Sequence, residues 1–179
     1  MFAVLGLAVS VSVLPFWHGF AWALVYGFFV SLAPILLVLY LLKTGRITEL
    51  HMSNTSERHI PYIAAIIFSA IAYLILDNSS GPELLKQLTV FNMIELATLG
   101  IINIFWLISI HATGIMASLV LVGLIFGWGP ALLIVGPFVV AVCWVRLYLK
   151  RHTPWQIIVG LLLGAVNVLA LSMLGFFIP

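Results

Sequence analysis

The chain has 179 residues, of which 64% are hydrophobic and only 7% are charged, and its mean hydropathy is +1.28. Soluble domains carry about 25% charged residues, and a soluble fold of this length could not bury so much apolar surface. The formal net charge of +2 is too small for a nucleic-acid-binding face, and a single cysteine cannot form a disulfide scaffold. The composition therefore predicts an integral membrane protein with no nucleic-acid partner.

Uncharged stretches along the chain predict its transmembrane helices, because crossing the hydrocarbon core takes about 20 apolar residues. Segment 2–42 is long enough for two spans with a break near Pro15–Gly19, and Gly127-Trp128-Gly129-Pro130 predicts the turn of a hairpin within 112–145. We expect an all-α fold, a polytopic transmembrane helical bundle that forms one integral membrane domain over residues 1–179. It has seven spans, or six if the first is only half-inserted, at about 2–16, 20–42, 60–76, 88–110, 112–126, 130–145 and 155–178.

The order of these spans brings three polar clusters, and with them the candidate active-site motifs, to one face of the membrane. The clusters run from Arg46 to His59, from Ser109 to His111 and from Arg146 to Gln156. This face holds six of the seven lysines and arginines, whereas the opposite face holds Lys86 with Asp77 and Glu83. By the positive-inside rule the polar face is cytoplasmic, and we expect a multi-pass protein of the plasma membrane of a prokaryote.

The third cluster contains Arg146 and His152, six residues apart, with Gln156 four residues further on. Pro154 suits the first turn of the last helix and Thr153 suits its N-cap, so His152 would lie where a helix N-terminus attracts anions. One interpretation is therefore a phosphate site. The other is that Arg146 is an interfacial anchor beside a histidine with no chemical role.

The second cluster places Ser109 and His111 at the boundary between two apolar segments. A lone interfacial histidine is most often an amphipathic residue with no part in catalysis. Beside a phosphate site, however, His111 could donate a proton to a leaving oxygen. The functional interpretation therefore depends on the combination of clusters.

Taken together, the clusters resemble the signatures of the type 2 phosphatidic acid phosphatase superfamily, over about residues 43–165. Arg146 and His152 keep the spacing of its third signature, in which an arginine precedes a histidine by six residues. Ser109 and His111 keep the Ser-x-His of its second signature, Pro-Ser-Gly-His. The order of the signatures along the chain is that of the family.

The first signature and the end of the third are matched more distantly. Arg58 stands for the arginine of the first signature, and His51, seven residues earlier, occupies the place of its lysine. Gln156 replaces the aspartate that in the family holds the nucleophilic imidazole. A glutamine carbonyl can accept the same N–H bond, but it brings no charge.

The resemblance implies phosphoryl transfer that needs neither a metal ion nor another cofactor. His152 attacks phosphorus to form a phosphohistidine, and His111 protonates the departing oxygen. Gln156 is the third catalytic candidate, as the residue that orients His152. The implied phosphate-binding residues are Arg58, Arg146, Ser109 and His51.

The expected substrate is a phosphomonoester or diphosphate of a membrane lipid, because the short loops leave no separate domain to hold a soluble substrate. Phosphatidate, phosphatidylglycerophosphate and isoprenyl phosphates or diphosphates all fit. A second hypothesis is a catalytically degenerate fold that serves as a lipid-binding or assembly subunit, with Gln156 as its main support. A small transporter is a third, and the oligomeric state is left open.

Glu95 is the one charged residue well inside a predicted span, together with Asn92 and Asn103 on nearly the same helical face. Carboxyl groups inside the bilayer are costly and are functional candidates. The three residues could line a cavity for a lipid headgroup. Alternatively, they form a hydrogen-bonded seam between helices in which Glu95 is protonated.

Overall fold

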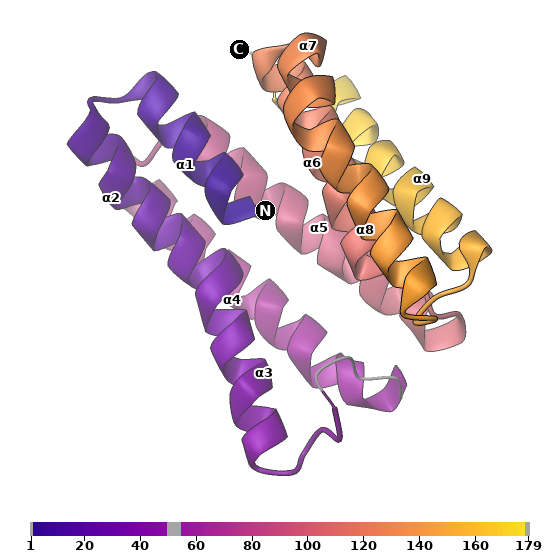
Figure 1. Cartoon of the computed structure of the whole chain (residues 1–179). Helices are drawn as coiled ribbons and strands as arrows, with labels where there is room; N and C mark the ends of the chain where they lie inside the picture. The colour runs from indigo at the N-terminus through magenta and orange to yellow at the C-terminus, as the bar shows by residue number, and fades with distance from the viewer. Residues whose placement is uncertain (1, 50–54, 178–179) are drawn as a thin grey trace. The chain divides into compact units, whose positions relative to one another are not determined.

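The computed structural model describes residues 2–49 and 55–177, and within these residues it is helical apart from short turns and contains no strand (Figure 1). The all-α prediction is therefore confirmed for the described chain. The helices form two compact units, the N-terminal unit Phe2–Ile104 and the C-terminal unit Phe105–Pro179, and each is described by itself. The single domain over residues 1–179 stays a prediction.

Within the described residues, five helical segments are long and apolar enough to cross a membrane. They are Phe16–Lys43, His59–Asn78, Glu83–Phe105, Trp128–Tyr148 and Pro154–Met173. Two more apolar helices are shorter: α6 has 17 residues and α1 has 12. At 1.5 Å per residue α1 extends about 18 Å, well short of the ~30 Å hydrocarbon core. The total of six or seven spans therefore stays a prediction, since only these five segments have the length of a span.

The N-terminal unit begins with two helices, α1 (Phe2–Val13) and α2 (Phe16–Gly27), which pack against each other. The break falls at Leu14–Pro15, because proline disfavours helical geometry in the residue before it. The predicted break near Pro15–Gly19 is therefore slightly late, and the next helix starts at Phe16 rather than at residue 20. A Cβ added to Gly6 would overlap the ring of Tyr26, so a small residue is required where α1 meets α2.

Helix α2 continues through one π-helical turn, η1 (Phe28–Leu32), into α3 (Ala33–Lys43). Pro34 lies two residues after the end of this turn, and in a regular α-helix its ring would clash with the carbonyl group four residues earlier. The wider π turn relieves that clash without ending the helix. In the C-terminal unit η3 (Ala131–Val135) precedes Pro137 in the same way.

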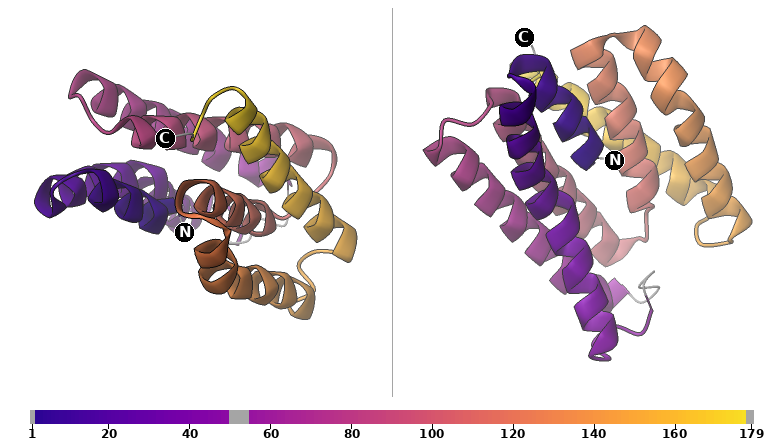
Figure 2. Two further views of the ribbon diagram at one scale, coloured as in Figure 1. Left: turned by 90° about the horizontal axis from the view of Figure 1, so that it is seen from above. Right: turned by 60° about the vertical axis from the view of Figure 1, so that its left-hand side comes forward.

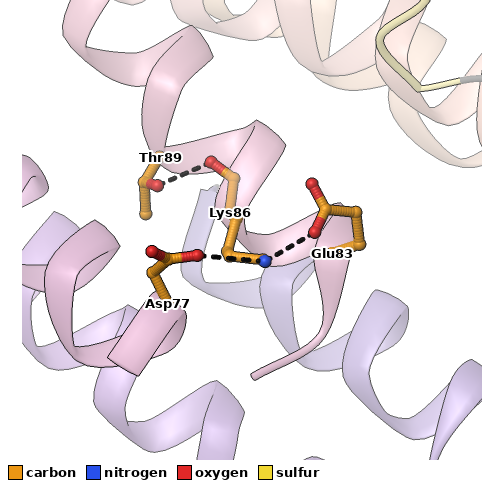
Figure 3. A network of polar contacts seen from close by, with 4 residues as sticks. All are labelled: Asp77, Glu83, Lys86 and Thr89. Atoms are coloured by element: carbon orange, nitrogen blue, oxygen red, sulfur yellow. Dashed lines mark hydrogen bonds and ion pairs between the residues drawn. The ribbon is translucent and has the colours of Figure 1, made fainter. Parts of the chain in front are cut away.

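The remaining helices of the N-terminal unit are α4 (His59–Asn78), which follows the 3-10 turn η2 (Thr55–Arg58), and α5 (Glu83–Phe105). Lys86 joins the end of α4 to the start of α5, since its Nζ lies 3.3 Å from Asp77 Oδ1 and 2.6 Å from Glu83 Oε2 (Figure 3). The predicted span 88–110 is shifted: α5 starts five residues earlier and ends at Phe105. Charged residues that pair with one another can belong to a helix end.

The C-terminal unit contains α6 (Ile110–Phe126), the short α7 (Trp128–Pro130), η3, α8 (Gly136–Tyr148) and α9 (Pro154–Met173). Gly127 ends α6 with a φ of +97°, a conformation that favours glycine. The chain then reverses direction, which confirms the predicted hairpin turn. Helices α6, α8 and α9 lie side by side (Figures 1 and 2).

Two glycines of α9 lie against α6. A Cβ on Gly160 would be 3.0 Å from Ser109 O, and a Cβ on Gly164 would overlap Thr113 O and lie 3.0 Å from Ala117 N. Moving four residues along α9 therefore moves about four residues along α6 in the same direction, so the two helices are parallel. The G-x-x-x-G pattern of α9 is a close-packing face.

We expect Gly164→Ala to lower the free energy of unfolding by about 3 kcal/mol, because its added methyl group meets backbone atoms that cannot rotate away. The measurement is unfolding by denaturant in lipid bicelles. Gly136→Ala is the matched control, since a Cβ there meets nothing within 4 Å. Equal stability of the two variants would contradict the parallel packing of α6 and α9.

Candidate functional site

Two capped helix N-termini carry most of the predicted site residues. Ser109 is the N-cap of α6, and its Oγ accepts a hydrogen bond from Ala112 N at 3.3 Å. Thr153 is the N-cap of α9, and its Oγ1 accepts a hydrogen bond from Gln156 N at 3.3 Å. Both N-caps have extended backbone geometry, and N–H groups at such helix ends attract anions.

The two N-termini are directly connected. Ser109 N donates a hydrogen bond to Gln156 O at 3.4 Å, and Ser109 is fully buried. Because α6 and α9 are parallel, their positive dipole ends point the same way. The structure therefore places the segments of the second and third predicted signatures, 47 residues apart between Ser109 and Gln156, side by side.

Arg146 lies in the last turn of α8, at the same end of the C-terminal unit. The chain turns there through a Schellman motif: Arg151 N donates to Arg146 O at 3.1 Å, and Lys150 N donates to Leu147 O at 2.9 Å. Lys150 takes the left-handed conformation that this motif needs, with a φ of +51°. The six-residue spacing from Arg146 to His152 is thereby folded into a compact turn between α8 and α9.

The charges of the C-terminal unit all have one sign. Residues 105–179 contain three lysines and arginines but no aspartate or glutamate. All three basic residues lie at the end of the unit where α6 and α9 begin. We call this the cationic end and define it by the residues Ser109, His111, Arg146, Lys150, Arg151 and His152. His111 is exposed there, and Arg146 and His152 are half-buried. This end carries the positive dipole ends of two helices and three cationic side chains, and the unit has no acidic residue to neutralise them. Such an arrangement favours binding of an anion.

Gln156 has a structural role in the described chain. Its Oε1 accepts a hydrogen bond from Thr153 N at 2.8 Å, and with the Thr153 side chain it completes a capping box at the start of α9. The oxygen that the family resemblance assigns to the His152 imidazole is thus engaged by the backbone. Orientation of His152 by Gln156 stays a prediction.

We expect Gln156→Ala to destabilise the protein by about 1 kcal/mol through loss of the capping box. Gln156→Glu keeps an acceptor oxygen at the same place, so its stability should stay close to that of the wild type. Denaturant unfolding of both variants in bicelles measures the difference. Equal losses for alanine and glutamate would contradict the capping role.

Arg58 belongs to the N-terminal unit, where it is buried with 9% exposure. Its guanidinium donates a hydrogen bond to Asn103 Oδ1 at 3.3 Å, and Asn103 Nδ2 donates to Tyr62 Oη at 3.2 Å. Tyr62 was not among the predicted residues, although its position four residues after Arg58 puts both on one helical face. His51 lies outside the described residues.

Comparisons with known proteins found no relative of the chain: no family model, no curated protein and no solved structure matches it. Within residues 2–49 and 55–177, no group of three or more His, Cys, Asp or Glu side chains is placed as metal ligands would be. The chemistry of the cationic end therefore has to be argued from its own residues.

Proposed function

We propose that the protein is a membrane lipid phosphatase whose cationic end binds and cleaves the phosphate of a lipid. The observation that carries this proposal is the Ser109 N to Gln156 O contact between the parallel helices α6 and α9. It joins the N-termini of α6 and α9, in a unit that contains no acidic residue. His111 follows the N-cap of α6, and His152 precedes the N-cap of α9. A phosphate dianion is the biological ligand that suits such a site.

The proposed reaction has two steps and needs no metal ion. His152 attacks phosphorus while the bond to the lipid oxygen breaks, and His111 gives a proton to that oxygen. His111 then takes a proton from water, which attacks the phosphohistidine and releases inorganic phosphate. Arg146 stabilises the charge on the non-bridging oxygens, as planar two-point donors do in phosphoryl transfer. The family resemblance adds Ser109 as a further phosphate contact.

A lipid substrate is supported by the surroundings of the cationic end. Trp106 and Trp155, near the starts of α6 and α9, are exposed, as are many large apolar side chains along α8 and α9. Exposed tryptophans and aliphatic side chains are typical of a surface in contact with lipid and its headgroups. We propose a multi-pass plasma-membrane protein with this end at the cytoplasmic face.

The test is release of inorganic phosphate by the purified protein in nanodiscs, with EDTA present. Phosphatidate, phosphatidylglycerophosphate and isoprenyl phosphates are supplied in turn. We expect release from at least one of them, with KM raised about 10- to 100-fold by Arg146→Gln, which removes charged hydrogen bonds. Arg46→Gln is the control, since Arg46 is exposed in the N-terminal unit. Loss of release in EDTA, or the same KM for both variants, would contradict the proposed site.

The second candidate is a lipid-binding or assembly subunit without turnover. It is favoured by the capping box, because a glutamine engaged at the helix end supplies less help to His152 than a carboxylate would. This candidate predicts binding of lipid phosphates that weakens with Arg146→Gln, with no phosphate released from any of them.

A further inference from the structure

The polar residues around the turn between α8 and α9 differ in how exposed they are (Figure 1). The predicted site residues Arg146, His152 and Gln156 are half-buried. Lys150 and Arg151 are exposed instead, and the proposed reaction uses neither of them. Because the C-terminal unit contains no aspartate or glutamate, two cations lie on its outer surface with no acid of the unit to neutralise them.

Lys150 occupies a position at which glycine is the usual residue. It directly follows Leu149, the C-cap of α8, and has the left-handed φ of +51°. This conformation is costly for a residue with a Cβ, and helices that end in a Schellman motif mostly have glycine there. Such strain persists mainly where a side chain is needed for function. The lysine therefore indicates a use for its side chain that glycine could not serve.

Two stacked aromatic rings border these cations on α8. Trp144 and Tyr148 are one helical turn apart, with ring centroids 5.2 Å apart and an interplanar angle of 22°. They are 61% and 70% exposed, and Tyr148 is the last residue of a segment long enough to span the membrane. Trp155, in the first turn of α9, is 69% exposed. Tryptophan and tyrosine concentrate where hydrocarbon meets the lipid headgroups.

We propose that these residues form a surface that binds an anionic phospholipid of the surrounding bilayer. We call it the headgroup patch and define it by Trp144, Tyr148, Lys150, Arg151 and Trp155. The two cations bind the headgroup phosphate, whose charge is complementary to theirs, and the aromatic rings contact the glycerol region. The occupant is a lipid rather than a soluble anion, because the patch continues into the exposed apolar surface of a spanning helix.

This lipid is bound and not cleaved, so the inference does not rest on the proposed phosphatase activity. The test uses nanodiscs that contain equal amounts of phosphatidylglycerol and phosphatidylcholine, and native mass spectrometry identifies the lipids that stay on the released protein. We expect the wild type to retain mainly phosphatidylglycerol. Lys150→Gly should lower the ratio of phosphatidylglycerol to phosphatidylcholine about fivefold, the contribution of one basic residue near an anionic surface. Lys150→Arg should keep the wild-type ratio.

Lys150→Gly also separates lipid binding from folding. Since glycine adopts the left-handed conformation without a steric cost, this variant should unfold at the same temperature as the wild type or at a higher one. Ser80→Gly is the matched control, because Ser80 is exposed with a φ of +53° in the turn after α4 and carries no charge. It should leave the lipid ratio unchanged.

Arg146→Gln distinguishes the headgroup patch from the candidate active site, and it should lower the lipid ratio less than Lys150→Gly does. The proposal is overturned if Lys150→Gly retains the wild-type ratio. It is also overturned if Arg146→Gln causes the larger loss, because the lipid would then occupy the candidate active site. Displacement of phosphatidylglycerol by inorganic phosphate would show a site for a soluble anion instead.

Discussion

His152→Ala should lower phosphate release from the preferred lipid phosphate by at least about 1,000-fold, since removal of a covalent nucleophile leaves only binding and charge stabilisation. His152 directly precedes the N-cap of α9, at the cationic end. Substrate binding depends on Arg146 and the helix N-termini, so the affinity for lipid phosphate should change little. The measurements are single-turnover rates and equilibrium binding in nanodiscs.

His18→Ala is the matched control for this loss. His18 is exposed on α2 in the N-terminal unit, far in sequence from every predicted signature. It should keep the wild-type rate. If a folded His152→Ala variant retains more than about a tenth of the wild-type rate, His152 is not the nucleophile, because nucleophiles contribute far more than tenfold to the rate.

His111→Ala is expected to have the second largest effect, and its size should depend on the leaving group. A general acid contributes about 100- to 10,000-fold when the departing oxygen needs a proton. An isoprenyl monophosphate expels an alkoxide, whereas an isoprenyl diphosphate expels a phosphate, which leaves without such help. His111→Ala should therefore slow formation of the phosphoenzyme strongly with the monophosphate and weakly with the diphosphate.

The comparison needs the same isoprenoid chain in both substrates, so that binding to the apolar surface is held constant. The first turnover is followed, because His111 is also proposed to activate water in the second step. His18→Ala should leave the ratio of the two rates unchanged. Equal slowing of both substrates by His111→Ala would assign His111 to binding or structure rather than to proton transfer.

The helices could be predicted from the sequence because uncharged segments of sufficient length have few alternatives in a membrane. Their ends were less predictable. Lys86 and Glu83 look like loop residues, yet they belong to α5 because Lys86 pairs with Glu83 and with Asp77 of α4. Pro34 and Pro137 look like breaks, but a π turn before each lets the helix continue.

The candidate site is likewise predictable from the sequence only in part. Gly160 and Gly164 predict a close-packing face, but only the fold shows that α6 is the partner and that the two helices are parallel. Thr153 and Gln156 form the T-x-x-Q pattern of a capping box, which is readable from the sequence alone. The hydrogen bond between Asn103 and Tyr62 has no such signal, since it depends on how α4 packs beside α5.

The most direct test of the central claim is to trap the phosphorylated enzyme. Protein in nanodiscs is mixed with a lipid phosphate labelled on phosphorus, quenched in alkali, which preserves phosphohistidine, and mapped by mass spectrometry. We predict label on His152, no label in His152→Ala, and more label in His111→Ala with the diphosphate because water is no longer activated. A turning-over enzyme with no label on His152, or with label on another residue, would contradict the proposal.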